Sequence, residues 1–240
     1  MSECLRVQVQ DSTWTLTLNR PEKRNALNAE LVEALIQAVE QAHASAADVL
    51  VLRGEGKNFC AGFDFSDFES VSEGDLLWRF VRIEQLLERL NNSAMLTVAL
   101  AHGKNFGAGV DLMAVCKHRV ACVDATFRMP GLKFGLVLGT RRLARLIGAE
   151  RTRQVQQIAK TLDARESLSI GLVSEVGEIN TWDQIIDQQQ QFASALTAQA
   201  RAALYGVLHH CTDDQDMADL VRSVTLPGLK QRIAKYRTGD

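Results

Sequence analysis

A glycine-rich stretch in the middle of the chain carries the residues whose types and spacing best suit catalysis. Residues 102–112 read His-Gly-Lys-Asn-Phe-Gly-Ala-Gly-Val-Asp-Leu. They lie between an apolar run that predicts a buried strand (96–101) and an apolar helical pattern (110–116). A helix start presents unpaired N–H groups and a partial positive charge, which can stabilise an oxygen that becomes negative during a reaction. Asp111 stands close to those donors, and the glycines beside Ala108 let the backbone approach a ligand.

Three interpretations other than catalysis are possible for this stretch. A strand–glycine–helix turn often only packs a helix against a sheet. No Gly-Lys-Ser or Gly-Lys-Thr sequence follows it, so it is not a phosphate-binding Walker loop. Leu112 stands where a dinucleotide-binding fingerprint has its third glycine, which makes that reading poor as well. Taken alone, the stretch leaves catalysis and simple packing open.

The composition limits the class of protein. With 240 residues, 46% hydrophobic and 23% charged, the chain has the make-up of a soluble globular protein with one substantial core. A net charge of −2 argues against nucleic acid or an anionic membrane as partner. The five cysteines lack CxxC spacing, which favours reduced thiols and a cytoplasmic location. We expect no secretory signal, no membrane span and no metal site.

The first half of the chain predicts a hairpin and then a parallel strand pair. Residues 5–9 and 13–19 alternate polar and apolar side chains, which is typical of half-buried strands. A polar loop ends at Asn28, a good helix N-cap. An amphipathic helix follows, and then a short buried strand at 49–52. Strand–helix–strand order implies a parallel pair joined by a crossover helix.

The second half is predicted to be mostly helical. Residues 64–75 hold five acidic and no basic side chains, which predicts a mobile, solvated surface loop. Asp163 to Glu166 has the pattern of a capping box. The other predicted elements are a helix at 76–90, a strand at 119–123, helices at 141–147 and 150–160, a strand at 172–176, and one long helix from 182 to about 208 capped by Thr181.

Four motifs in this order resemble the crotonase (enoyl-CoA hydratase/isomerase) superfamily. They are Asn19 to Asn28, Phe59 to Asp64, the central glycine turn, and Gly171 to Val173. The resemblance spans roughly residues 5–180. It implies an α/β fold with a crotonase-like ββα spiral core over residues 1–180. It also implies a helical C-terminal region, residues 181–240, that mediates assembly into a homotrimer or a dimer of trimers.

The same resemblance implies an acyl-CoA thioester as ligand and no cofactor beyond the coenzyme A of that substrate. By motif position, the backbone N–H groups of Phe63 and Ala108 hold the thioester oxygen and stabilise an enolate. Asp111 is the matching catalytic carboxylate. The positions that match substrate-binding residues are Lys23, Arg24, Ala26, Leu27, Ala61, Asp64, Phe65, Gly107 and Gly131.

The chain departs from the family pattern at the second carboxylate. Family hydratases use two glutamates to hold and activate water. Asp111 occupies the first position, one methylene shorter, and Gly131 occupies the second, where it offers no titratable group. The segment from Pro130 to Arg142 is also shorter than usual, with its glycine cluster reduced to Gly139. We therefore expect weak or no hydratase activity, because hydration needs an acid and a base.

Other side chains near these motifs are expected to pack or to face solvent rather than to replace the missing glutamate. We expect a packed core role for His102 and Cys60 and a solvated position for the rest. These are Lys133, Asp67 and Glu69. The tail cations Lys230, Arg232, Lys235 and Arg237 could reach a phosphate of coenzyme A, but a solvated helix face is the preferred interpretation.

Three functions remain open at the level of the sequence. The leading hypothesis is an enoyl-CoA hydratase/isomerase-type enzyme in which one carboxylate, Asp111, transfers a proton next to the thioester. One carboxylate suffices for double-bond isomerisation, because it can remove and return the same proton. The alternatives are an acyl-CoA-binding protein without hydratase activity, and a decarboxylase or C–C hydrolase acting through the same enolate.

Overall fold

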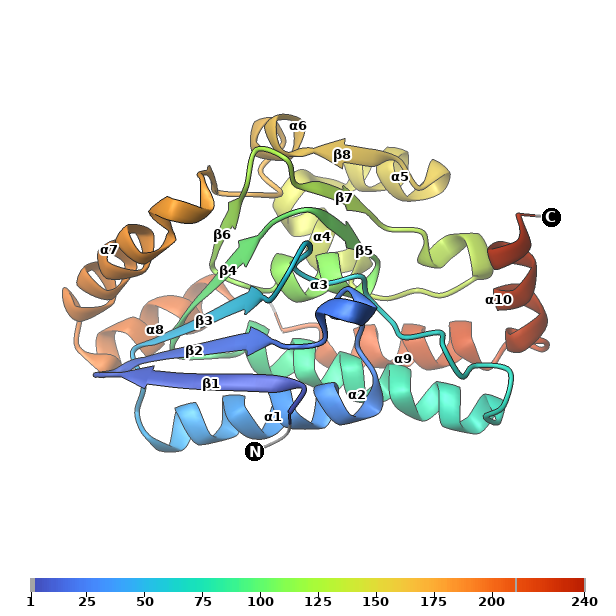
Figure 1. The fold of residues 1–240 in the computed structure, drawn as a ribbon, viewed down its shortest axis with the longest axis horizontal. Helices are drawn as coiled ribbons and strands as arrows, with labels where there is room; N and C mark the ends of the chain where they lie inside the picture. The colour runs from blue at the N-terminus through green and yellow to red at the C-terminus, as the bar shows by residue number, and fades with distance from the viewer. Residues whose placement is uncertain (1–2, 210, 240) are drawn as a thin grey trace.

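The computed structural model describes residues 3–209 and 211–239. Its main sheet has six strands in the order β1-β2-β3-β4-β6-β9 (Figure 1). The first two strands are antiparallel, as the predicted hairpin requires, and every later neighbouring pair is parallel. The strands are β1 (Leu5–Gln10), β2 (Thr13–Leu18), β3 (Val49–Gly54), β4 (Leu96–Ala101), β6 (His118–Ala121) and β9 (Glu175–Val176).

A second, three-stranded sheet lies beside the main one, in the order β5-β7-β8. Its strands are β5 (Lys104–Phe106), β7 (Thr126–Arg128) and β8 (Thr161–Asp163). The chain passes from the main sheet to the small one at β4–β5 and again at β6–β7, with the helix α3 (Ala108–Ala114) between these passages (Figure 1). This strand–strand–helix order confirms the predicted α/β spiral. The strands β5, β7 and β8 were not predicted, because three residues are too few for a periodic pattern.

Helices α1 (Ala29–Ala44) and α2 (Glu73–Asn91) pack together below the main sheet, and α9 (Asp213–Val224) packs against α2 (Figure 1). Asn28 caps α1 as predicted, since its side chain accepts a hydrogen bond from the N–H of Leu31 (3.0 Å). The helix buries the stripe predicted for it, including Leu35 and Val39. Burying such a stripe stabilises an amphipathic helix far more than its intrinsic propensity does.

The acidic segment before α2 differs from the solvated loop predicted for it. Asp64 is buried and pairs with Arg20 (2.9 Å), while Asp67 pairs with Arg79 (2.8 Å). Phe68 is buried as well. The basic partners come from outside the segment, so its own composition could not reveal them. The segment is therefore anchored to the body of the protein.

Two short helices follow the small sheet's second strand. They are α4 (Thr140–Ile147) and α5 (Ala149–Ile158), separated at Gly148 as predicted. The next helix, α6 (Ala164–Ser169), has Asp163 as its N-cap, which accepts from the N–H of Glu166 (2.7 Å). The predicted capping box is only half formed, because the Glu166 carboxylate pairs with Lys160 instead.

The C-terminal helices are α7 (Trp182–Ser194), α8 (Ala198–Leu208), α9 and α10 (Leu229–Thr238). The single helix predicted from 182 to about 208 is wrong, because Thr197 caps a new helix by accepting from the N–H of Ala200 (3.2 Å). Thr181 does not cap α7; its hydroxyl donates to the carbonyl of Glu178. The boundary at residue 180 stays a prediction. No helix in the described part of the chain is long and apolar enough to cross a membrane.

Candidate active site

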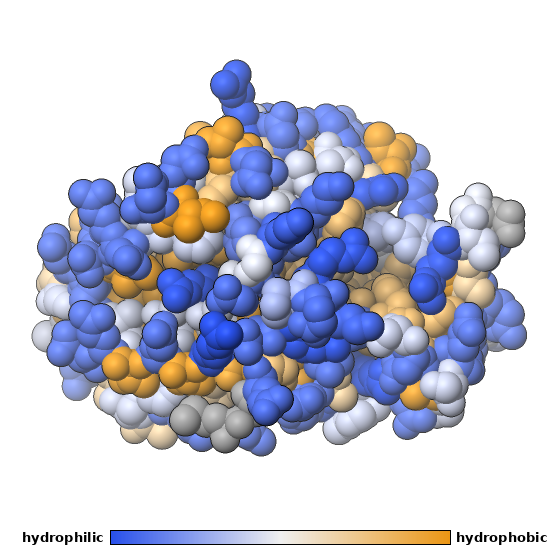
Figure 2. All heavy atoms as spheres, in the orientation of Figure 1, coloured by the Kyte–Doolittle hydropathy of each residue, from blue (hydrophilic) through white to orange (hydrophobic). Residues whose placement is uncertain are grey.

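A cavity of about 280 Å³ opens between the 61–65 segment, the start of α3, the 3₁₀ helix η2 (Gly131–Phe134) and α10. In Figure 2 the right half of the visible face is hollowed, with apolar atoms recessed between hydrophilic ones. The lining is mostly aromatic and aliphatic. Its polar side chains are Arg24, Asp111, Gln156 and Tyr236. A mostly apolar cavity with few polar groups is typical of a small-molecule site.

The structure gathers most of the sequence-predicted site residues around this cavity, and places four of them elsewhere. Lys23 is exposed. Ala26 and Leu27 are buried and do not line the cavity. Asp64 forms an ion pair with Arg20. The eight that line the cavity are Arg24, Ala61, Phe63, Phe65, Gly107, Ala108, Asp111 and Gly131.

The backbone N–H groups of Phe63 and Ala108, two residues that line the cavity, have no acceptor among the described residues. Leu27 pairs with the residues on either side of Phe63: its N–H donates to Gly62 (2.7 Å) and its carbonyl accepts from Asp64 (3.2 Å). In this parallel bridge the Phe63 N–H faces away from Leu27. Both N–H groups can therefore donate to an oxygen of a ligand.

Gly62 lets these two donors come close to each other. A Cβ at this position would lie 2.3 Å from the carbonyl oxygen of Phe106 and 3.3 Å from the nitrogen of Ala108. Its φ of +82° is also a conformation that other residues rarely adopt. The 61–63 segment and the start of α3 can approach this closely only because the residue between them has no side chain.

Asp111 is almost completely buried, with 3% of its surface exposed. Burial raises the pKa of its carboxyl well above the ordinary value; the positive charge of Arg142 opposes this shift and the negative charge of Glu84 adds to it. No side-chain donor to its carboxylate is found among residues 3–209 and 211–239. A desolvated carboxylate of this kind is a stronger base than a solvated one, which suits proton abstraction.

Gly139 sits directly against this carboxylate. A Cβ on Gly139 would lie 1.9 Å from Oδ1 of Asp111, and the φ of Gly139 is +64°. From the sequence, Gly139 was recognisable only as the remnant of a glycine cluster, because the contact joins the N-cap of α4 to a residue of α3. Gly139 leaves the space that the Asp111 carboxylate occupies.

We expect Gly139→Ala to lower turnover by about 10²-fold, because a displacement of about 1 Å at a reacting group has that effect. The measurement is kcat with an acyl-CoA substrate. Gly228→Ala is the matched control: like Gly139, Gly228 is a helix N-cap in the left-handed conformation (φ 76°, ψ 39°), and its added Cβ would come no closer than 3.2 Å to any atom, the end of the flexible Gln231 side chain. Equal losses in both variants would show that backbone strain, and not the collision with Asp111, is responsible.

A buried ion pair, Arg142 with Glu84, lies close enough to Asp111 of α3 to affect its pKa. Both terminal nitrogens of Arg142 donate to the carboxylate of Glu84, and the two side chains are 4% and 1% exposed. Arg142 also lies 3.6 Å from Asp216 of α9. No local sequence pattern predicts this cluster, because its members come from α2, α4 and α9. The cluster places one buried cation near Asp111.

The side chains that could have replaced the missing glutamate either pack in the core or face solvent. His102 is buried, and its Nε2 hydrogen bonds with the carbonyl of Gly56 (2.9 Å), which confirms a packed core histidine. Burial raises the pKa of the Cys60 thiol to about 12, so it stays protonated and packs. Lys133 is exposed, as predicted.

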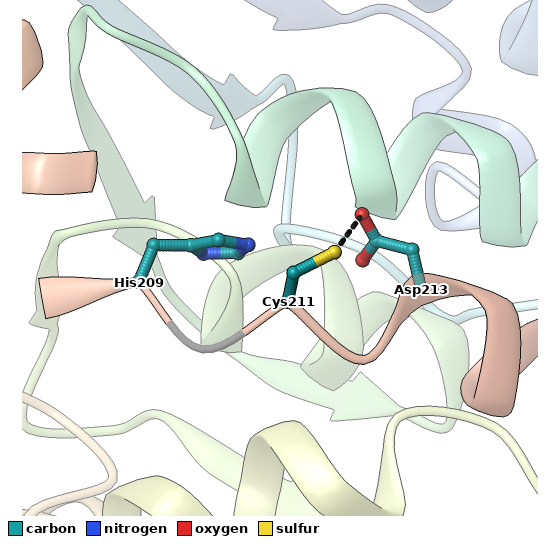
Figure 3. A group of neighbouring side chains, drawn as sticks. All are labelled: His209, Cys211 and Asp213. Atoms are coloured by element: carbon teal, nitrogen blue, oxygen red, sulfur yellow. Dashed lines mark hydrogen bonds between the residues drawn. The ribbon is translucent and has the colours of Figure 1, made fainter. Parts of the chain in front are cut away.

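One group of possible metal ligands forms away from this cavity, at the connection between α8 and α9 (Figure 3). Ligand atoms of His209, Cys211 and Asp213 lie within 4.8 Å of one another. The Cys211 thiol donates to the Asp213 carboxylate (3.6 Å) and the Asn92 amide donates to the same oxygen (2.7 Å). These three residues do not line the cavity that contains Asp111. That the protein binds no metal remains a prediction.

Comparison with known proteins agrees with this architecture and identifies the family. Residues 8–226 match the model of the enoyl-CoA hydratase/isomerase family. The chain is 37% identical over 173 residues to the "probable enoyl-CoA hydratase echA6" of Mycobacterium tuberculosis, covering 70% of this chain and 69% of that protein. It is 31% identical over 226 residues to the 2,3-dehydroadipyl-CoA hydratase of Escherichia coli, covering 91% and 85%.

A solved structure from Bordetella parapertussis, described as an enoyl-CoA hydratase/isomerase, superposes with a TM-score of 0.97. It is 52% identical in sequence and covers 98% of this chain and 99% of that one. The chain therefore belongs to the enoyl-CoA hydratase/isomerase family, that is, to the crotonase superfamily. Proteins of this family act on acyl-CoA thioesters.

Proposed function

We propose that this protein is an acyl-CoA enzyme that moves a proton on a carbon near the thioester, with Asp111 as its single acid–base. One observation carries the proposal. A buried carboxylate with a raised pKa shares an apolar cavity with the unpaired backbone N–H groups of Phe63 and Ala108, and the described residues that line this cavity include no second carboxylate. This combination fits reactions in which one group takes a proton and gives it back.

The proposed reaction has two steps. The thioester oxygen accepts hydrogen bonds from Phe63 and Ala108, the ionised Asp111 removes a proton from carbon, and the electron pair of that C–H bond forms the enolate. The protonated Asp111 then returns its proton to a different carbon of the same conjugated system, which shifts the double bond. No cofactor takes part beyond the coenzyme A of the substrate.

Isomerisation is preferred over hydration because of Gly131. Water addition needs a second positioned group, and Gly131 contributes only backbone to the cavity. An acyl-CoA-binding protein without chemistry is the second candidate, supported by the same missing carboxylate. Decarboxylation or C–C hydrolysis through the same enolate is the third, because the two N–H donors serve any thioester enolate.

Incubation of the protein with unsaturated acyl-CoAs in deuterated water tests these candidates. We expect the double bond to shift, with deuterium at the α or γ carbon wherever the proton on Asp111 exchanges with solvent before it is returned, and hydration of crotonyl-CoA well below the ~10 s⁻¹ of a typical enzyme. Binding with neither a shifted double bond nor label would support the binding protein instead. Rapid hydration would show that another group replaces the missing glutamate.

The pH dependence should report the raised pKa of Asp111. Because the base must be ionised, kcat/KM should fall as pH falls through this pKa, and the midpoint should lie well above the ~3.9 of an ordinary aspartate. Glu88 also titrates in this range. Burial, together with the negative charges of Glu84 and Asp213, raises the pKa of Glu88 to about 7. Glu88→Gln is therefore the control: loss of the acidic limb in this variant would assign the limb to Glu88.

The assembly and location are proposed on other grounds. Helices α7 and α8 expose large apolar side chains, including Phe192 (58%), Val207 (82%) and Leu208 (68%). Exposed apolar surface of this kind is typical of an assembly interface, which supports a homotrimer or dimer of trimers. The scattered cysteines support a cytoplasmic location.

A further inference from the structure

One buried polar side chain in the cavity that contains Asp111 takes no part in the proposed reaction. Gln156 lines this cavity from α5 and is 5% exposed. Its side-chain amide has no hydrogen-bond partner in the described part of the chain, whereas the amide of the next residue, Gln157, accepts from Arg153 (3.0 Å). Burying an amide without a partner costs stability, so this side chain needs an explanation.

The position of Gln156 on α5 is one that an amphipathic helix normally fills with an apolar residue. It lies on the buried face of the helix with Thr152 and Val155, at helical spacing. The Thr152 hydroxyl is satisfied, because it donates to the carbonyl of Gly148 (3.0 Å). Ile158, two residues after Gln156, is 63% exposed. The helix therefore buries an amide and leaves an aliphatic side chain in solvent, an arrangement that stability alone does not favour.

The amide of Gln156 is open to the cavity and is not sealed in the core. Both of its polar atoms keep some accessible surface, unlike Nδ1 of His102, which is fully enclosed without a partner. Because Gln156 is almost completely buried and lines the cavity, this accessible surface lies in the cavity. A group inside the cavity can therefore hydrogen bond to the amide.

The chemistry of the lining limits what that group can be. Met129, Phe134 and Leu136 are apolar members of the lining, and a hydrocarbon chain packed among them would leave the amide unpaired. A buried water molecule needs two to four polar partners, which a mostly apolar lining does not supply. An anion is disfavoured by the carboxylate of Asp111 in the same cavity. A neutral oxygen of the ligand itself fits best, because an amide can both donate and accept.

We infer that Gln156 is a specificity-determining residue that hydrogen bonds to a neutral oxygen, hydroxyl or keto, on the acyl chain of the ligand. This inference rests on the proposed function for the identity of that ligand as an acyl-CoA. The coenzyme is much larger than a cavity of about 280 Å³, so the most enclosed part of the lining faces the acyl group. The substrate class is then an oxygenated acyl thioester and not a plain hydrocarbon one.

Gln156→Met tests the amide while keeping the length and the unbranched shape of the side chain. Methionine suits a helix as well as glutamine does, and it removes the unpaired amide, so we expect the variant to fold with an unchanged or slightly higher Tm. The matched control is Gln157→Met, which removes the amide of the exposed neighbour that does not line this cavity.

Four saturated coenzyme A thioesters, which undergo no net isomerisation, probe the acyl chain in calorimetric titrations: hexanoyl, 4-oxohexanoyl, 5-oxohexanoyl and 6-hydroxyhexanoyl. They share chain length and charge and differ in the presence and place of one neutral oxygen. We expect the unaltered protein and Gln157→Met to bind at least one oxygenated ester roughly 5- to 150-fold more tightly than the hexanoyl ester, the effect of leaving one buried amide unpaired. Gln156→Met should lose this preference and bind the hexanoyl ester more tightly than the unaltered protein does.

Two results would overturn the inference. One is that the unaltered protein binds no oxygenated ester more tightly than the hexanoyl ester, a comparison that does not depend on any variant folding. The other is that Gln156→Met keeps the preference of the unaltered protein. Rapid hydration of crotonyl-CoA that is lost in Gln156→Met would replace the inference, because the amide would then hold a water molecule. If the unaltered protein binds none of the four esters, the proposed function itself fails, and the inference fails with it.

Discussion

Asp111→Asn is expected to lower turnover roughly 10²- to 10⁴-fold, the usual contribution of a positioned proton-transfer group. The amide has nearly the same shape as the carboxyl but cannot accept the proton. The backbone donors at Phe63 and Ala108 are unchanged, so the affinity for an acyl-CoA should change little. The experiment measures kcat and the dissociation constant on the same purified variant. Full turnover in Asp111→Asn would end the catalytic assignment.

The same variant should be more stable than the parent at neutral pH. Burial raises the folded-state pKa of Asp111, so the folded protein holds this proton more tightly than the unfolded chain. Stability is therefore lost as pH rises from the unfolded value of ~3.9 towards the folded pKa, and the neutral amide avoids this loss. We expect Tm to rise by at least about 2 °C, the effect of ~1 kcal/mol at this chain length, and to rise more at pH 8 than at pH 5.

Asp67→Asn serves as the matched control for both measurements. Asp67 is a carboxylate on the segment near the cavity, but it is half exposed and pairs with Arg79 at the surface. Exposed pairs of this kind contribute up to about 1 kcal/mol. We expect its turnover to stay close to that of the parent and its Tm to fall slightly. A large loss of turnover in Asp67→Asn would favour a catalytic group on this segment.

Arg142→Met is expected to destabilise the protein by about 3–5 kcal/mol, because it leaves the buried carboxylate of Glu84 without its partner. At this chain length the change corresponds to a fall in Tm of roughly 6–20 °C. The cation that lowers the pKa of Asp111 is lost too. The acidic limb of kcat/KM should therefore move to higher pH in whatever protein stays folded.

Arg141→Met is the control for this variant, since Arg141 is the adjacent residue with a 42% exposed side chain and pairs with Asp216 and Asp219. Its loss should cost much less than that of Arg142, because the buried Asp216 keeps Arg142 and the Thr212 hydroxyl as partners and the pair with the half-exposed Asp219 contributes no more than about 1 kcal/mol. Combining Arg142→Met with Glu84→Gln should recover much of the stability, because no buried charge is then left unpaired at this position. Similar Tm values for Arg141→Met and Arg142→Met would contradict the role assigned to the buried pair.

Local patterns were enough to predict elements whose signal lies within a few neighbouring residues. The alternation at 13–19 predicted β2, the apolar run at 96–101 predicted β4, and Asn28 marked the start of α1. The motif order identified the superfamily and drew attention to Asp111 and to Gly131. Elements without a local signal were missed, such as the three-residue β5 and the break between α7 and α8.

By itself, the sequence determined the strand–helix–strand order and the placement of Asp111 at a helix start, and its resemblance to a known family implied the α/β spiral and the missing carboxylate at Gly131. Periodicity and motif spacing are properties of contiguous residues, so they can be read without coordinates. Only the tertiary structure decided that Gly139 touches the Asp111 carboxylate and that Arg142 is buried against Glu84. It also decided that Gln156, on the buried face of α5, lines the cavity that contains Asp111. Each of these contacts joins residues far apart in the chain, and burial, which sets the charge state of Asp111, depends on all the elements packed around it.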